Sequence, residues 1–300
     1  MNPSVSVITV TKNEADRVLK TLLSVNRQTG CSFEHVIVDG QSTDGTVEQV
    51  RRHGEKHTRL HVESDSGIAE AMNRGVRKAR GDFLIHLNAG DVFVGTRTLA
   101  WVVDSYRRQG WRWAIGASVQ ETPGGDRCRY AIPRRFSYEN LVRRNFVNHQ
   151  ATFVERALFD EYGGFDGDFG IALDYEYWLR IGRKVAPAIL PIFVSYLEPY
   201  RVASNSVVNY WEDRRARKRH GAADGLVGEM AQIGVRLTLV GMRRLLPSSL
   251  YDSVRSGEFY RHLRGLFAAD EGREDVVVSF SDCPDGVQEE GVWRTEVGET

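Results

Sequence analysis

Short apolar runs alternate with stretches of helical spacing over residues 5–91. The apolar, β-rich runs occupy residues 5–10, 35–38, 60–62 and 83–87. Between them, helical spacing covers residues 18–25, 46–52 and 68–79. A strand–helix–strand order joins neighbouring strands in parallel and packs helices against the sheet. The sequence therefore predicts an α/β fold with a mostly parallel sheet flanked by helices.

Polar segments directly follow three of these predicted strands. They are residues 11–14, 39–45 and 88–91. In open parallel sheets, ligands bind beyond the carboxyl ends of the strands. We therefore expect a ligand site at this edge of the sheet, built from loops that are far apart in the sequence.

The loop after the first strand excludes two common nucleotide sites. Residues 11–17 contain no glycine, so the tight phosphate turn of a dinucleotide-binding site cannot form there, and the chain has no Gly-Lys-Ser/Thr phosphate loop. A divalent cation with oxygen ligands could instead join a carboxylate to a diphosphate. Each candidate acid could equally be a turn former or a helix cap. The candidates are Asp39, Asp44, Asp65 and Asp91.

Four segments together resemble family 2 glycosyltransferases. They are residues 6–14, 38–46, 63–75 and 81–91, and residues 148–150 and 163–166 also fit the pattern. The resemblance covers about residues 1–200. It implies a GT-A fold, a nucleoside diphosphate sugar as donor, a divalent metal (Mn²⁺ or Mg²⁺) and inversion at the anomeric carbon.

The same resemblance assigns the donor side of the site. The residues that it places on the donor are Thr9, Thr11, Glu14, Asp39, Asp65, Asn73 and Asn88. The first three would line the pocket for base and ribose, and Asp39 would hold the nucleoside. Asp65 and Asn73 would lie beside the nucleotide or the sugar.

The metal ligand implied by the resemblance is Asp91. It matches the last acid of the family's Asp-x-Asp-like motif. Many relatives have two adjacent acids at this point, whereas Gly90 precedes Asp91 in this chain.

Residues 172–180 resemble the acceptor-side helix of the family, where an acid is the general base. Inversion requires a base that removes the proton of the acceptor hydroxyl, and Asp174 matches that position. The alternative is that Asp174 caps a helix whose aromatic face lies in the core. Further candidates for contact with the acceptor or the diphosphate are His149, Glu176, Trp178 and Arg180.

The predicted function is transfer of a sugar to a hydroxyl of a glycan, lipid-linked or small-molecule acceptor in polysaccharide or glycolipid biosynthesis. A UDP-sugar is the default donor, and GDP- and dTDP-sugars stay open. Two alternatives stay open as well. A nucleotidyltransferase would normally show a glycine-rich basic loop after the first strand, and a non-catalytic sugar-nucleotide-binding protein would not need Asp174.

Three regions are expected along the chain. Residues 1–204 form the catalytic domain, with a donor half of about 1–100 and an acceptor half of about 101–204. Residues 205–268 form a helical extension, and residues 269–300 form an acidic, loosely ordered tail. Within the extension, residues 230–246 combine an apolar face with arginines, which suits either an anionic membrane surface or packing, including a homodimer.

The composition limits the classes of binding partner and the cellular compartment expected for this protein. The net charge is zero and no nucleic-acid-binding motif accompanies the basic run 214–219, so no nucleic acid is expected. No run of 18 apolar residues is present, so no membrane-spanning helix is predicted. Three widely spaced cysteines favour a cytoplasmic protein, with peripheral attachment to the inner face of the cell membrane as an option.

Overall fold

A mixed β-sheet forms the centre of the protein. The computed structural model describes residues 4–121, 127–129, 132–133, 135–143, 145–197, 206–221 and 275–276. The strands of the sheet are β1 (Val5–Thr11), β2 (Phe33–Asp39), β3 (Thr58–Val62), β4 (Phe83–His86), β5 (Val92–Phe93), β6 (Trp113–Glu121), β7 (Arg127–Arg129), β9 (Thr152–Glu155) and β10 (Ala188–Leu197). Within the described residues they run in the order β3-β2-β1-β4-β9-β6-β10-β5, and β7 pairs with β6.

The first four strands of this order are parallel. β1 pairs in parallel with both β2 and β4, and β2 pairs in parallel with β3. β9 is antiparallel to both β4 and β6 and therefore joins this half of the sheet to the second half. The predicted α/β fold with helices on both faces of the sheet is confirmed, and so is the parallel pairing of the strands in residues 5–91 that were predicted from the sequence.

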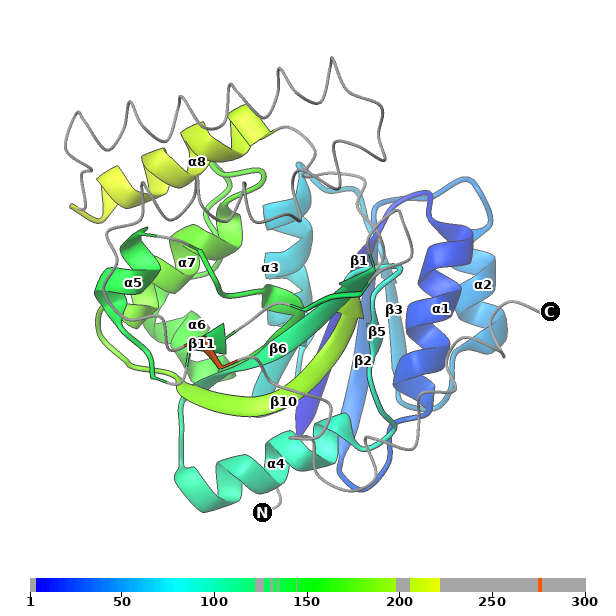
Figure 1. The fold of residues 1–300 in the computed structure, drawn as a ribbon. Helices are drawn as coiled ribbons and strands as arrows, with labels where there is room; N and C mark the ends of the chain where they lie inside the picture. The colour runs from blue at the N-terminus through cyan, green and yellow to red at the C-terminus, as the bar shows by residue number, and fades with distance from the viewer. Residues whose placement is uncertain are drawn as a thin grey trace.

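Helices cover both faces of the sheet (Figure 1). One face carries α3 (Ile68–Lys78), α5 (Tyr138–Arg143), α6 (Arg156–Tyr162) and α7 (Leu173–Gly182), and the other carries α1 (Ala15–Asn26), α2 (Thr46–His53) and α4 (Thr98–Gln109). Alternate residues of β1 belong to different cores: Ile8 and Val10 pack on the α3 and α7 side, while Val5 and Val7 pack on the α4 side. A strand that is apolar on both faces is typical of a sheet buried between helices.

The second half of the chain differs from the sequence prediction in two places. The apolar pattern of the sequence predicts a strand over residues 150–154, whereas a 3₁₀ turn, η1 (His149–Ala151), precedes β9. The pattern also predicts a strand from Phe193, whereas β10 begins five residues earlier, at Ala188. Its pairing with β6 shifts register between Ile189 and Phe193, around Pro191, which has no N–H for a ladder hydrogen bond.

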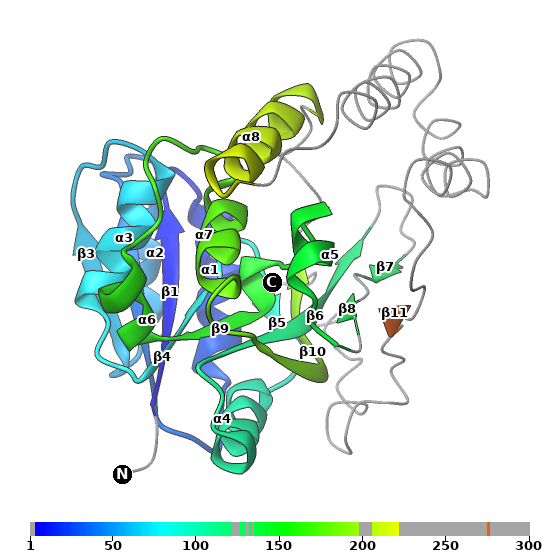
Figure 2. The ribbon, with the colours of Figure 1, turned by 90° about the vertical axis from the view of Figure 1, so that its left-hand side faces the viewer.

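Helix α8 (Ser206–Arg219) lies against α7, as Figures 1 and 2 both show. Near the C-terminus, β11 (Asp275–Val276) pairs with β8 (Ile132–Pro133). The rest of the expected extension and acidic tail, including the apolar helix at 230–246 with Arg236, Arg243 and Arg244, lies outside the described residues. In the part of the chain that is described, no helix is both long and apolar enough to cross a membrane.

Two buried histidines lower the stability of the folded state in acid. His35 on β2 and His86 on β4 are at most 4% exposed, and burial lowers the pKa of each from 6.5 to about 3. The unfolded chain therefore binds protons below pH 6.5 that the folded chain refuses, so the stability present above pH 6.5 is lost progressively as the pH falls toward 3. We expect the free energy of unfolding to fall by about 1.4 kcal/mol per pH unit for each histidine over pH 6–5.

Urea unfolding at several pH values checks this expectation. His86→Leu should lower the slope by about 1.4 kcal/mol per pH unit, and leucine suits a site among the rings of Phe159 and Phe165. His53→Ala, a change outside the core, should leave the slope as it is. A wild-type stability that is flat between pH 7 and 5 would contradict the prediction.

Candidate functional site

The carboxyl ends of β1, β2 and β4 meet at one edge of the sheet. Parallel pairing places Thr11 beside Asp39 and Ile8 beside His86. The backbone N–H of Gly40 donates to the carbonyl of Thr11 across this edge at 2.9 Å. The loops after these strands therefore leave the sheet side by side, which confirms the predicted convergence.

The two threonines of β1 have different surroundings. Thr9 is fully buried, its hydroxyl donates to the carbonyl of Leu87 at 2.7 Å, and it lies 2.9 Å from Nε2 of His35. Thr9 thus joins β1 to its neighbours on either side, and its contact with the base or the ribose stays a prediction. The Thr11 hydroxyl is buried and has no hydrogen-bond partner among the described residues, so it can still bond a ligand.

Asp44 and Glu14 lie at the starts of helices. The carboxylate of Asp44 accepts the backbone N–H groups of Ala15 at 3.1 Å and Thr46 at 3.0 Å, so it fixes the first turns of α1 and α2. The hydroxyl of Thr46 also donates to this carboxylate and lowers the pKa of Asp44. The carboxylate of Glu14 pairs with Arg17. The capping interpretation therefore holds for Asp44.

Asp39 ends β2, and Asp65 follows β3 and approaches the backbone just after Asp39. Asp39 is fully buried, and its two carboxylate oxygens accept the N–H of Ser42 at 2.8 Å and its hydroxyl at 2.6 Å. A Cβ atom on Gly40 would lie 2.7 Å from Oδ2 of Asp65, which shows how closely Asp65 approaches this backbone. The structure therefore brings these two predicted donor residues together.

Asn73 on α3 joins the two halves of the chain. Its amide nitrogen donates to the carbonyl of Phe165 at 2.7 Å, and its amide oxygen accepts the N–H of the same residue at 2.8 Å. A Cβ on Gly164 would lie 2.3 Å from the Asn73 oxygen, so glycine is required for this approach. Asn73 therefore holds the loop before α7, and its direct contact with a donor stays a prediction.

The turn at residues 88–91 presents the predicted metal ligand. Asp91 follows β4 by five residues, lies just before β5 instead of ending β4, and is 6% exposed. Its Oδ2 accepts the amide N–H of Gln150 at 3.2 Å. Gly90 has a φ of +99°, a conformation that side chains other than that of glycine rarely adopt. The backbone therefore explains why an acid does not occupy position 90.

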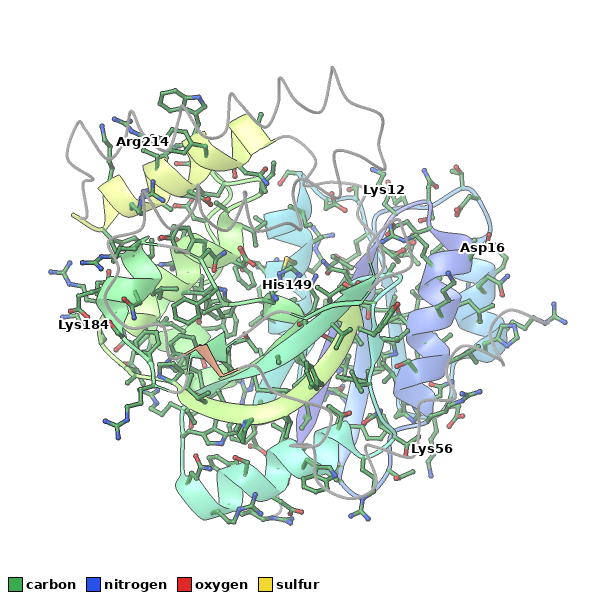
Figure 3. All side chains as sticks on the ribbon, viewed as in Figure 1. Lys12, Asp16, Lys56, His149, Lys184 and Arg214 are labelled. Atoms are coloured by element: carbon green, nitrogen blue, oxygen red, sulfur yellow. The ribbon has the colours of Figure 1, made fainter. Side chains whose placement is uncertain are left out.

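His149 bridges this turn and the predicted base. Its Nε2 lies 3.0 Å from the amide nitrogen of Asn88, and its Nδ1 lies 3.0 Å from Oδ2 of Asp174. In Figure 3, His149 lies near the middle of the molecule, between the α7 side and the β1–β3 side. The short turn η1 thus contacts the turn at residues 88–91 through two side chains, His149 and Gln150, and α7 through His149.

Asp174 is the second residue of α7, and its Oδ1 accepts the backbone N–H of Tyr175 in the first turn of this helix at 2.6 Å. The N-cap is Ala172, and the carboxylate of Glu212 on α8 accepts backbone N–H groups at the helix start, at 2.6 Å from Ile171 and 2.8 Å from Ala172. Glu212 therefore holds the backbone just before α7, while Oδ2 of Asp174 faces Nδ1 of His149 at 3.0 Å. Its side chain is 14% exposed.

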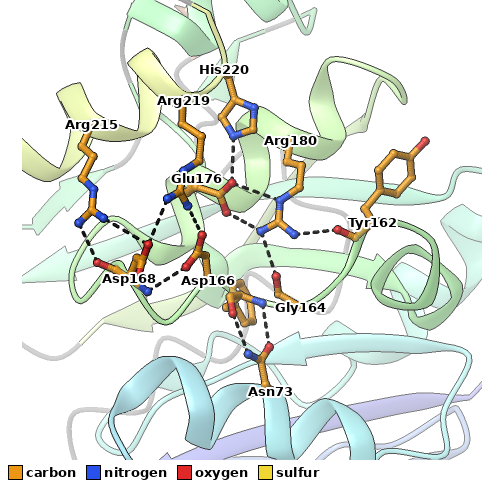
Figure 4. Close-up of polar contacts among 11 residues, drawn as sticks. Asn73, Tyr162, Gly164, Asp166, Asp168, Glu176, Arg180, Arg215, Arg219 and His220 are labelled. Carbon is orange, nitrogen blue, oxygen red and sulfur yellow. Dashed lines mark hydrogen bonds and ion pairs between the residues drawn. The ribbon is translucent and has the colours of Figure 1, made fainter.

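Glu176 and Arg180 belong to a structural network (Figure 4). Glu176 lies 2.9 Å from Nε2 of His220 and also pairs with Arg180, which donates to the carbonyls of Tyr162 at 2.7 Å and Gly164 at 2.9 Å. Burial would raise the pKa of Glu176, but hydrogen bonds from His220 and Arg180 lower it below its ordinary value. These partners leave both side chains engaged in holding α7, α8 and the loop between α6 and α7.

The aromatic residues of α7 lie in the core. Trp178 is 1% exposed and stacks on Trp113, with ring centroids 5.6 Å apart. Tyr175 and Tyr177 are fully buried. Burial excludes these rings as platforms for a sugar face, so the assignment of Trp178 to the acceptor site is corrected.

Positions 88–91 offer one carboxylate, of Asp91, and one buried amide oxygen without a hydrogen-bond partner among the described residues, of Asn88. No cluster of three or more His, Cys, Asp or Glu side chains with metal-binding geometry occurs among the described residues. A cation bound mainly by one carboxylate takes its other ligands from phosphate oxygens and water, as Mg²⁺ commonly does. Asp91, which faces the turn at the donor edge, is the residue of this chain that would hold it.

Sequence reasoning missed three residues that organise the site. Gln150 follows His149 in a segment that resembles the family, so this signal was present but no role was assigned. Glu212 and His220 reach α7 from α8, at separations of 40 and 44 residues, and no motif marks them. Only the tertiary structure reveals that α8 supports the acceptor helix.

Comparison with known proteins shows which family this chain resembles. The model described as glycosyl transferase family 2 matches residues 6–161. The putative teichuronic acid biosynthesis glycosyltransferase TuaG of Bacillus subtilis is 37% identical over 221 residues, which cover 70% of this chain and 84% of that protein.

Two solved structures share the fold. TarS 1–349 of S. aureus, in complex with UDP-GlcNAc, has a TM-score of 0.61 at 15% identity and covers 87% of this chain and 78% of that chain. The mannosyltransferase PcManGT from Pyrobaculum calidifontis, in complex with GDP-Man and Mn²⁺, has a TM-score of 0.51 at 24% identity. This match covers 79% of this chain and 65% of that chain. Together with the sheet order and the matched residues, these similarities show a GT-A-type glycosyltransferase, and the chain belongs to glycosyl transferase family 2.

Proposed function

We propose that this glycosyltransferase moves a sugar from a nucleoside diphosphate sugar to an acceptor hydroxyl, with a divalent metal and inversion at the anomeric carbon. The observation that carries the proposal is the meeting of donor edge and acceptor helix at η1. Gln150 contacts Asp91 at 3.2 Å, and His149 contacts Asn88 and Asp174 at 3.0 Å each. A metal ligand and a base held by one turn suit a single displacement.

The donor would lie along the carboxyl ends of β1, β2 and β4. The Thr11 hydroxyl and the carboxylates of Asp39 and Asp65 lie at this edge and are proposed to bind the nucleoside. A cation at Asp91 would offset the negative charge of the leaving diphosphate. TarS with UDP-GlcNAc and PcManGT with GDP-Man and Mn²⁺ support this donor class and this metal.

On the acceptor side, Asp174 would accept the proton of the attacking hydroxyl. The C–O bond to the diphosphate would break as the new glycosidic bond forms on the opposite face of the anomeric carbon. A fixed base is effective because the carboxylate needs no reorganisation during the reaction. The name of TuaG supports an acceptor from polysaccharide biosynthesis. Attachment to an anionic membrane and a homodimer stay proposals.

A thermal-shift panel tests the donor class. UDP, GDP, dTDP and their sugars are compared with and without Mn²⁺. A ligand that binds only the folded state adds about 2.7 kcal/mol of stability at a hundredfold excess over its Kd. We expect one nucleoside diphosphate to raise the Tm in Mn²⁺ and much less in EDTA. No shift with any nucleotide would contradict the proposed donor site.

A further inference from the structure

His149 has a fixed place between two predicted functional residues. It comes from η1, whose residues contact β4, β6 and β10 at the centre of the sheet. Its side chain is 19% exposed, and both ring nitrogens lie 3.0 Å from a polar atom. The partner on one side is Asn88, at the donor edge, and the partner on the other is Asp174, on α7.

The chemistry of these partners fixes the tautomer of the ring. An ionised carboxylate only accepts hydrogen bonds, so the Nδ1 that faces Asp174 must carry the proton. In the neutral ring Nε2 is then an acceptor, which matches the amide nitrogen of Asn88 as donor. Every hydrogen-bonding group of the imidazole is therefore used, and the ring orientation is determined.

The same contacts determine the orientation of Asp174. Its Oδ2 accepts the imidazole N–H at 3.0 Å, and its Oδ1 accepts the backbone N–H of Tyr175 at 2.6 Å. A carboxylate held at both oxygens has lost rotation about its terminal torsion. Each oxygen retains acceptor capacity for an incoming hydroxyl proton.

We propose that His149 is a positioning residue that aims the Asp174 carboxylate and is itself held in place by Asn88. The inference rests on the proposed function, since it takes Asp174 as the base. It differs from a role in binding the acceptor or the diphosphate, because both ring nitrogens are engaged with protein groups. In the chain Asn88–His149–Asp174, each hydrogen bond fixes the orientation of the next side chain.

Three substitutions at position 149 separate the two contacts. His149→Ala should lower kcat about 10- to 100-fold, the range for loss of a hydrogen bond to a charged group, while the donor KM stays near that of the wild type. His149→Asn places an amide N–H near the Nδ1 position and should restore much of kcat. His149→Gln places its amide near Nε2 instead and should stay as slow as His149→Ala. His53→Ala is the matched control, with unchanged kcat and Tm.

A double-mutant cycle with Asp174→Asn shows whether His149 acts through the base. A positioning role predicts that His149→Ala has little further effect in the Asp174→Asn background. A full further loss of 10- to 100-fold, a fall in nucleoside diphosphate affinity, or equal rates for the Asn and Gln variants would overturn the inference. A wild-type protein that transfers no sugar would instead contradict the proposed function, so the two failures are distinguishable.

Discussion

Asp174→Asn is expected to lower kcat by about 10²–10⁴-fold, the usual effect of losing a general base. Asparagine has nearly the same shape, and its amide oxygen can accept the N–H of either Tyr175 or His149. The fold and the affinity for the nucleoside diphosphate should therefore persist. Steady-state rates, together with calorimetric titration of the nucleoside diphosphate, measure both quantities on the same variant.

Glu176→Gln is the matched control for this experiment. Glu176 is also an acid of α7, but it is only 3% exposed at its side chain and is paired with Arg180 and His220. Removing one partner of a buried ion pair typically costs about 3–5 kcal/mol of stability. Glu176→Gln should therefore lower the Tm more than it lowers kcat. A folded, inactive Glu176→Gln beside an active Asp174→Asn would show that the base is wrongly assigned.

Asp91→Ala is expected to abolish metal-dependent binding of the nucleoside diphosphate and, with it, activity. Asp91 is the acid at the turn where the diphosphate is proposed to lie, and no phosphate loop replaces it. The Asp91 carboxylate accepts a hydrogen bond from the Gln150 side chain. Alanine removes this carboxylate and this hydrogen bond but leaves the backbone of the turn in place. Titration of the nucleotide with and without Mn²⁺ measures the difference directly.

The control for this variant is Asp104→Asn. Asp104 pairs with Arg107 on the surface of α4, and its side chain is 49% exposed. This change should leave nucleotide affinity in Mn²⁺ and turnover unaltered. Undiminished turnover by Asp91→Ala in Mn²⁺ or Mg²⁺ would contradict the assignment of the metal site.

The donor edge was predictable because local patterns determine it. Alternating strands and helices require a parallel sheet, and the polar segments after the strands must then meet at one edge. The role of each side chain was less predictable. Thr9 lies in β1 and Asp39 ends β2, and both residues are fully buried. Thr9 forms hydrogen bonds to the neighbours of its strand, whereas Asp39 lies at a strand end and bonds the loop that follows.

The acceptor half was predicted less well because its contacts are long-range. Asn73 meets Phe165 across 92 residues, and Glu212 accepts the N–H of Ala172, just before α7, from 40 residues away. The aromatic run of α7 suggested a sugar platform, but a ring packs equally well in a core, and Trp178 stacks on Trp113. Helical spacing alone does not tell which face of α7 is buried, since the partner α8 comes from outside the family-like segment.

Proton NMR of the reaction tests the central claim, sugar transfer from a nucleoside diphosphate donor with inversion. The protein is incubated with Mn²⁺, the donor that raises its Tm and a panel of hydroxyl acceptors, and the anomeric proton and the released nucleotide are followed together. The account predicts release of a nucleoside diphosphate and a product whose anomeric configuration is opposite to that of the donor. A product with the donor's configuration, or release of pyrophosphate as in nucleotidyl transfer, would contradict it.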